Sequence, residues 1–305
     1  KTGSDIVAAN TQGFDISTSS TGGTTAYKKA INAISNPDEF DINMLVTPGV
    51  IHGLHNSVTN HAISKCESRG DAFYILDCTK YGDTIATATA AISSLDTNYA
   101  ATYYPWVKIV DRNTSLPVWV PPSVVIPGVI AFTDSVAHEW FAPAGLNRGG
   151  LSNVRMTKKK LTHTDRDTLY EGRVNPIASF PGQGVVVFGQ KTLQAKPSAL
   201  DRINVRRLLI RLKKFIASSS RFLVFEQNDS STRSRFLNIV NPFLESVQSN
   251  SGLSAFKVVM DDSNNTPDVI DRNQLVGQIF IQPTRTAEFI VLDFSVLPTG
   301  AAFPE

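Results

Sequence analysis

Strand and helix patterns alternate along the first 135 residues, and this alternation limits the possible folds more than any other feature of the chain. The patterns, in order, are a helix at 24–35, a strand at 40–49, a helix at 55–70, a strand at 72–78, a helix at 82–95 and a strand at 104–111. Strands that alternate with helices are typical of parallel βαβ units. We therefore expect an α/β domain over residues 24–145.

The pattern changes after residue 145, where we place a domain boundary. The second half contains a short helix at 165–172, a strand at 184–193, a basic helix at 201–216, a helix at 231–248, and strands at 255–261, 274–283 and 287–296. Only short links join the last three strands, which predicts antiparallel neighbours. Residues 146–305 are thus expected to form an α+β domain, with a small, mainly antiparallel sheet flanked by helices.

Charge and targeting signals exclude several classes of protein. The chain of 305 residues has 29 basic and 27 acidic residues, so no overall field favours nucleic acid. We find neither a signal peptide nor a run of roughly 18 apolar residues, which predicts a soluble protein without membrane anchoring. Cys66 and Cys78 are too few for a disulfide framework, so we expect a reducing compartment. Residues 1–23, without an initiator Met, are interpreted as a linker that continues from a longer polypeptide.

The segment DRINVRRLLIRLKKFI, residues 201–216, concentrates positive charge on a helix. Its residues Val205, Leu208, Leu212 and Phe215 recur at the spacing of one buried helical face. Such a helix can simply present its cations to solvent, bind nucleic acid, or face an acidic protein surface. The nucleic-acid interpretation is weakened because no aromatic stacking residues alternate with these cations.

The candidates for chemistry are few. His52, His55 and His61 have the spacing H-x2-H-x5-H, but a zinc site usually needs a fourth ligand, and we favour solvated histidines on a helix surface. Cys66 and Cys78 lie in apolar patterns, where buried thiols are usually inert.

Two groups of loops could in principle bind ions or phosphates. The segment 261–268, DDSNNTPD, gathers carboxylates and amides, but it lacks the spacing of a calcium loop and is better explained as a turn. The glycine-containing loops GGTT, NRGG and PGQG match no phosphate-binding fingerprint. We predict no catalytic residues, no cofactor and no metal, and we regard a hydrolase-like enzyme as a distant alternative.

Several long segments resemble the tail sheath proteins of T-even-like contractile bacteriophages. They are WFAPAGLNRGGL, LYEGRVNPI, VVVFGQKTL, DRINVRRLLIRLKKFI, NNTPDVIDRNQLVGQIFIQPTRTAEFIVLDF and TGAAF, in that order. The resemblance is dense from residue 139 onward, and the front half of the family's polypeptide is missing. A sheath of a related contractile injection system or bacteriocin is the alternative.

The resemblance implies a structural role. Family members polymerise into a helical sheath around the tail tube and contract by rigid-body rearrangement to drive the tube through the host envelope. Residues 24–145 would then be an outer domain and residues 146–305 an inner domain. Expected partners are further copies of the chain, the tail tube protein, and baseplate and terminator or neck proteins. The expected location is the virion tail, after assembly in the host cytoplasm.

Two sets of residues are predicted to contact neighbours. Sheath subunits are joined by terminal arms that add strands to each other's sheets, and the end of this chain, with an arm at about 295–305, suits such a joint. The residues predicted for the strand joint are Phe289, Val291, Phe294, Val296, Leu297 and Phe303. The residues predicted to face the tube or an adjacent subunit are Arg202, Arg206, Arg207, Arg211, Lys213 and Lys214. Lys158, Lys159 and Lys160 form a second candidate patch.

Overall fold

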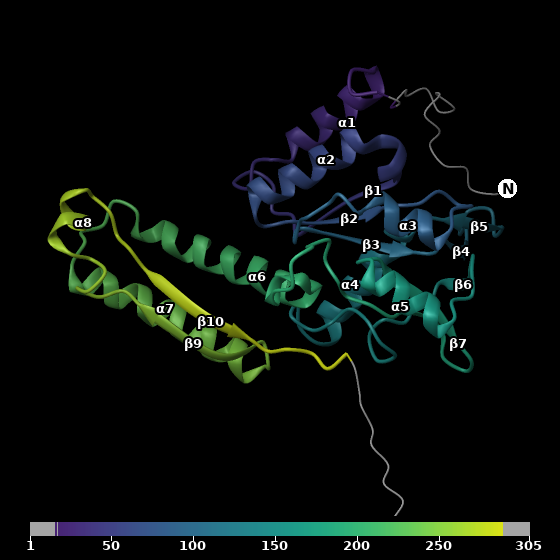
Figure 1. Cartoon of the computed structure of the whole chain (residues 1–305). Coiled ribbons are helices and arrows are strands. Elements are labelled where there is room, and N and C mark those ends of the chain that lie inside the picture. The colour runs from purple at the N-terminus through teal and green to yellow at the C-terminus, as the bar shows by residue number, and fades with distance from the viewer. Residues whose placement is uncertain (1–15, 17, 289–305) are drawn as a thin grey trace, which may run out of the picture.

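The computed structural model describes residue 16 and residues 18–288 (Figure 1). Within these residues the largest sheet, which we call the central sheet, has five strands in the order β1-β2-β3-β7-β8. The strands are β1 (Met44–Ile51), β2 (Phe73–Asp77), β3 (Ala100–Tyr104), β7 (Asn175–Phe180) and β8 (Gly184–Val187). Strands β1, β2, β3 and β7 run parallel, and β8 pairs antiparallel with β7. The parallel βαβ arrangement predicted from the alternation of patterns is confirmed.

Helices cover both faces of the central sheet, because side chains of a buried strand alternate between its two faces. In β2, Tyr74 and Leu76 pack against one layer of helices, while Phe73 and Ile75 pack against the other. The first layer contains α1 (Gly22–Ala33), α2 (His52–Arg69), α3 (Ile85–Ala91) and α5 (His163–Glu171). The second contains the 3-10 turn η1 (Pro122–Val124), α4 (Ile126–Val136) and the start of α6 (Ile203–Ser220).

The strand predicted at 104–111 does not belong to the central sheet. The parallel strand is β3, which ends before Pro105, a residue without an N–H for the ladder. The following strand, β4 (Val107–Val110), pairs antiparallel with β5 (Pro117–Val120) and β6 (Val154–Thr157) in a small separate sheet. Strand β1 likewise differs from the prediction, because it continues through Pro48 and Gly49 with a shift of register.

The predicted boundary near residue 145 falls between strands of the same sheet. Strands β7 and β8 come from the second half of the sequence, but they extend the central sheet that the first half begins. We therefore call residues 22–193 the α/β unit. The residues that follow, 194–288, are the C-terminal unit.

The C-terminal unit extends away from the central sheet (Figure 1). Its elements are the 3-10 turn η2 (Ala199–Asp201), α6, the 3-10 turn η3 (Arg221–Leu223), α7 (Ser230–Ser249), β9 (Leu253–Val259), α8 (Pro267–Asp271) and β10 (Gln278–Pro283). Strands β9 and β10 pair antiparallel, as predicted, and pack with α6 and α7 around a separate apolar core. The third predicted strand covers residues 287–296. Its positions from 289 onward lie outside the described residues.

Candidate functional site

Helix α6 joins the two units, because it contributes side chains to two apolar cores. Ile203 and Ile210 pack beneath the central sheet, whereas Leu208 and Leu212 pack against α7 and β9. The predicted stripe is confirmed for Val205, Leu208 and Leu212, which are buried. Phe215 is only half-buried and stacks on Phe243 of α7, with 3.7 Å between ring centroids. Apolar packing therefore covers two sides of the helix, and Arg211 and Lys213 lie at exposed positions.

Arg207 is buried and forms a two-pronged ion pair with the α/β unit. Its Nη1 and Nη2 donate to Oδ1 and Oδ2 of Asp134 in α4, at 2.8 and 2.6 Å. Nη1 also donates to the backbone oxygen of Glu139 at 3.2 Å. Such a paired geometry fixes both distance and orientation, because the planar guanidinium must match the carboxylate. Arg207 thus holds α6 in one position against α4.

Arg206 is also buried, and it packs on the loop before β3. Its guanidinium carbon lies 4.1 Å from the centre of the Tyr99 ring, and Nη2 donates to Oδ1 of Asn98 at 2.5 Å. Burial lowers the pKa of the Arg206 guanidinium, and the neighbouring Tyr99 partly offsets this effect. A desolvated cation over an aromatic face is worth about 2 kcal/mol, more than the same contact on the surface.

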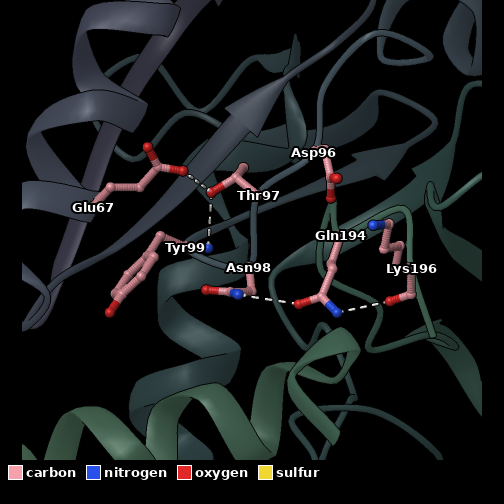
Figure 2. Close-up of a pocket in the computed structure, with 7 residues that line it drawn as sticks. All are labelled: Glu67, Asp96, Thr97, Asn98, Tyr99, Gln194 and Lys196. Carbon is pink, nitrogen blue, oxygen red and sulfur yellow. Dashed lines mark hydrogen bonds between the residues drawn. The ribbon is translucent and has the colours of Figure 1, made fainter. Parts of the chain in front are cut away.

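The same loop also binds the connection between the two units (Figure 2). Asn98 Nδ2 donates to Oε1 of Gln194 at 3.0 Å, and the backbone N–H of Ala195 donates to Oδ1 of Asp96 at 2.8 Å. A polar pocket of about 420 Å³ lies here, lined in part by Glu67 and Lys196. Its side chains mostly bond one another, so the pocket anchors the connection and presents no catalytic group.

The two lysines of α6 bond to the end of α2 and to the loop before β1. Lys213 Nζ donates to the backbone oxygen of Arg69 at 2.9 Å. Lys214 Nζ donates to Oδ1 of Asp41 at 2.5 Å and to the backbone oxygen of Ile42 at 2.7 Å. The bond and charge of Lys214 lower the pKa of Asp41.

Only one of the six predicted basic residues lacks a hydrogen bond or ion pair among the described residues. Arg202 pairs with Glu288, at 2.7 Å, and with Asp201, at 3.0 Å. Arg211 is exposed and influences Asp41 only through its charge. The sequence pattern could not reveal these partners, because they lie 68 or more positions away for Arg206, Arg207, Lys213 and Lys214.

The second basic patch is divided among local contacts. Lys158 Nζ lies 4.1 Å from the centre of the Tyr81 ring and donates to its hydroxyl at 2.9 Å. Lys159 pairs with Asp165 at 3.3 Å, and Lys160 is exposed. The first part of the segment 261–268 is a turn, as expected, in which the Asp261 carboxylate accepts hydrogen bonds from Ser263, but Pro267 and Asp268 begin α8.

The three predicted histidines do not converge on a metal site. His52 and His55 are buried, so our interpretation of them as solvated was wrong, whereas His61 is half-buried. His52 Nδ1 bonds the hydroxyl of Thr59 at 2.7 Å, and His55 Nδ1 accepts from the backbone N–H of Ile51 at 3.0 Å. Within residues 16 and 18–288, no group of three or more His, Cys, Asp or Glu side chains is arranged to hold a metal ion.

Cys66 and Cys78 are buried thiols, as expected from their apolar surroundings. Burial raises the pKa of each to about 12, so neither supplies a thiolate nucleophile near neutral pH. In the part of the chain that the structure describes, no helix combines the length and apolar character needed to span a membrane.

The fold is that of a contractile sheath subunit. The sheath of an extracellular contractile injection system, PVC, in its contracted state superposes with a TM-score of 0.75 and 27% sequence identity, covering 87% of this chain and 74% of the other. A chain of the anti-feeding prophage baseplate superposes with a TM-score of 0.67 and 25% identity, covering 85% and 70%. Both likenesses extend across the α/β and C-terminal units.

Sequence comparison assigns the chain to a family, which is a more specific result than the shared fold. Residues 22–193 match the phage tail sheath protein central domain, and residues 195–296 match the phage tail sheath C-terminal domain. The chain is 41% identical to the tail sheath protein of Vibrio phage KVP40 over 211 residues, which are 69% of this chain and 30% of the relative. It is 36% identical to that of Enterobacteria phage T4 over 271 residues, 82% of this chain and 40% of the relative. The chain belongs to the phage tail sheath family, and it spans less than half of these relatives.

The ion pair of Arg207 should contribute strongly to stability. Replacing Arg207 with Met removes the partner of a largely buried carboxylate, and we expect a loss of about 3 kcal/mol in the free energy of unfolding. Arg211→Met is the matched control on the same helix, and we expect a change below about 0.5 kcal/mol. Chemical denaturation of both variants measures the difference. Equal losses of unfolding free energy in the two variants would contradict the stabilising role of the Arg207–Asp134 ion pair.

The buried histidines should make stability depend on pH. Burial lowers the pKa of His52 and of His55, so below the unfolded value of about 6.5 the unfolded chain binds more protons than the folded chain. The thermal unfolding midpoint should therefore fall as the pH is lowered from 7.5 to 5.5. His55→Asn keeps an acceptor for the Ile51 N–H and should reduce this slope, whereas His163→Asn, at an exposed position, should not. An unchanged dependence of the midpoint on pH in His55→Asn would contradict the assignment of this dependence to the buried histidines.

Proposed function

We propose that this chain forms the α/β and tube-proximal parts of a contractile phage tail sheath. In this proposal the chain polymerises with further copies into a helical sheath around the tail tube. Contraction then rearranges the subunits as rigid bodies and drives the tube through the host envelope. The observation that carries the proposal is the match of both sheath domains in consecutive order, with 36% identity to a curated tail sheath protein over 271 residues.

The contacts of α6 support rigid-body movement. A subunit that is to change its packing without changing its own shape needs a firm connection between its units. Helix α6 provides it through side chains in two cores, and through Arg206 and Arg207, which bond separate elements of the α/β unit. We assign the α/β unit to the outer domain and the C-terminal unit to the inner domain, with the division near residue 194 and not near 145.

The β9–β10 pair supports the strand joint. Among the described residues this sheet has two strands, and Phe280 of β10 is 56% exposed. A pair of strands is marginal on its own and leaves edges that other strands can extend. We propose that terminal arms of neighbouring subunits complete this sheet by strand addition. The residues predicted for the strand joint, Phe289, Val291, Phe294, Val296, Leu297 and Phe303, all lie outside the described residues.

The turn after α6 is a further contact surface in this proposal. Phe222 and Phe225 are 82% and 101% exposed, and Phe225 has a φ of 71°, which is unusual for a bulky residue. Exposed aromatic side chains of this kind are typical of surfaces that another protein covers. Neighbouring copies, the tail tube, the baseplate and the tail terminator are the proposed partners, and the virion tail is the proposed location.

A sheath of a contractile injection system is the second candidate, because such sheaths share the fold. The curated relatives at 36% and 41% identity are phage proteins, which favours the phage tail. The hydrolase alternative has no support, since the family is that of tail sheath proteins.

Removal of residues 295–305 tests the strand joint directly. The residues described in the two apolar cores all precede position 289, and we expect the truncated polypeptide to keep the circular dichroism spectrum and the thermal midpoint of the intact one. It should not form ordered tubes, which negative-stain microscopy and sedimentation would detect. Ordered tubes at the normal concentration would contradict the joint.

Arg211 tests the predicted contact of the basic helix. The other five basic residues bond within the chain, so we now limit the tube- or neighbour-facing role to Arg211. Arg211→Glu should weaken assembly on isolated tubes at least severalfold, more at low than at high salt, because exposed charge pairs are screened. Arg272→Glu, at an exposed arginine that follows α8, is the control. Equal assembly of the two variants would contradict the role.

A further inference from the structure

The segment that follows β10 is held mainly by polar contacts. Residues 284–288, which we call the C-terminal strap, run back from β10 to the α/β unit (Figure 1). Residues 284–287 are exposed, so little apolar burial fixes their course. A pocket of about 470 Å³ lies between the strap and the start of α6. The backbone N–H of Thr284 donates to the oxygen of Gly252 at 3.2 Å, and beyond this bond the position of the strap depends on the hydrogen bonds that its side chains make.

Glu288 makes most of these bonds. Its Oε1 accepts from Arg202 Nε at 2.7 Å and from Gln190 Nε2 at 3.0 Å, and its Oε2 accepts from the Tyr170 hydroxyl at 2.7 Å. Gln190 Nε2 also donates to the Thr286 hydroxyl at 2.6 Å. The Glu288 side chain is only 17% exposed, so it is largely removed from water.

The three donors come from different parts of the fold. Tyr170 is in α5, Gln190 follows β8, and Arg202 precedes the first turn of α6. Gln190 is buried, and the Tyr170 ring lies 4.4 Å from Lys191 Nζ and 5.8 Å from the guanidinium carbon of Arg202. A carboxylate that accepts from three ordered donors, one of them cationic, is a strong anchor.

We propose that Glu288 anchors the base of the C-terminal arm to the α/β unit and to the start of α6, so that force on the arm passes to α5, to the segment after β8 and to α6, and not to β10. This inference rests on the proposed function, because it takes residues beyond 288 to be the joint between subunits. Without the anchor, a pull at residue 289 would act on the end of β10 and separate it from β9 one hydrogen bond at a time. With the anchor, the same pull acts on three side chains at once. Glu288 is thus a positioning residue of the joint.

Arg285 supplies a direct test, because trypsin cleaves after exposed arginines and needs the strap to detach. In Glu288→Gln one of the two carboxylates that Arg202 pairs with loses its charge, and we expect cleavage after Arg285 to accelerate roughly tenfold. Tyr170→Phe removes one donor and keeps the ring, so it should show a smaller increase. Glu245→Gln, at an exposed position of α7, is the control. Cleavage after Arg272 within each variant is an internal reference.

Assembly of the intact polypeptide completes the test. If Glu288 carries the load, Glu288→Gln should form fewer or shorter tubes than the control at equal concentration. Unchanged cleavage after Arg285 in Glu288→Gln and Tyr170→Phe would contradict the role of Glu288 as an anchor. Faster cleavage together with normal tubes would contradict the claim that force on the arm passes through Glu288. Failure of the proposed function is a different result: there the polypeptide without residues 295–305 still forms tubes, whatever the trypsin rates.

Discussion

The structure depends on one helix that belongs to two cores. Ile203 and Ile210 of α6 complete the packing beneath the central sheet, while Leu208 and Leu212 complete the packing of α7 and β9. Neither unit can move relative to the other without exposing one of these sets of side chains. Burial of each such side chain contributes about 1.5 to 3 kcal/mol, so the connection is firm before any polar contact is added.

The positive charge of α6 adds orientation to this packing. Arg206, Arg207, Lys213 and Lys214 bond four separate sites along the α/β unit. Buried ion pairs often add little net stability, but they are costly to break and so disfavour other orientations. The net charge of +2 is consistent with this arrangement, because much of the helix's charge is paired within the chain.

Local patterns in the sequence predicted several of the elements, but not α4, β5, β6, β7 and α8. The stripe of α6, the buried strand β2 and the antiparallel β9–β10 pair follow from periodicity and short links. Contacts between distant segments could not be predicted in the same way. Strand β7 joins the central sheet across the expected boundary, and Arg207 finds Asp134 73 positions away. The burial of His52 and His55 also depends on such packing, since nothing in their spacing distinguishes a solvated from a buried histidine.

The firm connection through α6 is the central claim, and the most direct measurement is cryo-electron microscopy of the same sheath before and after contraction. Superposition of the α/β unit from the two states should bring the C-terminal unit, residues 194–288, into coincidence, with the Arg207–Asp134 pair intact in both. A rotation between the units, with that pair broken in one state, would contradict the account.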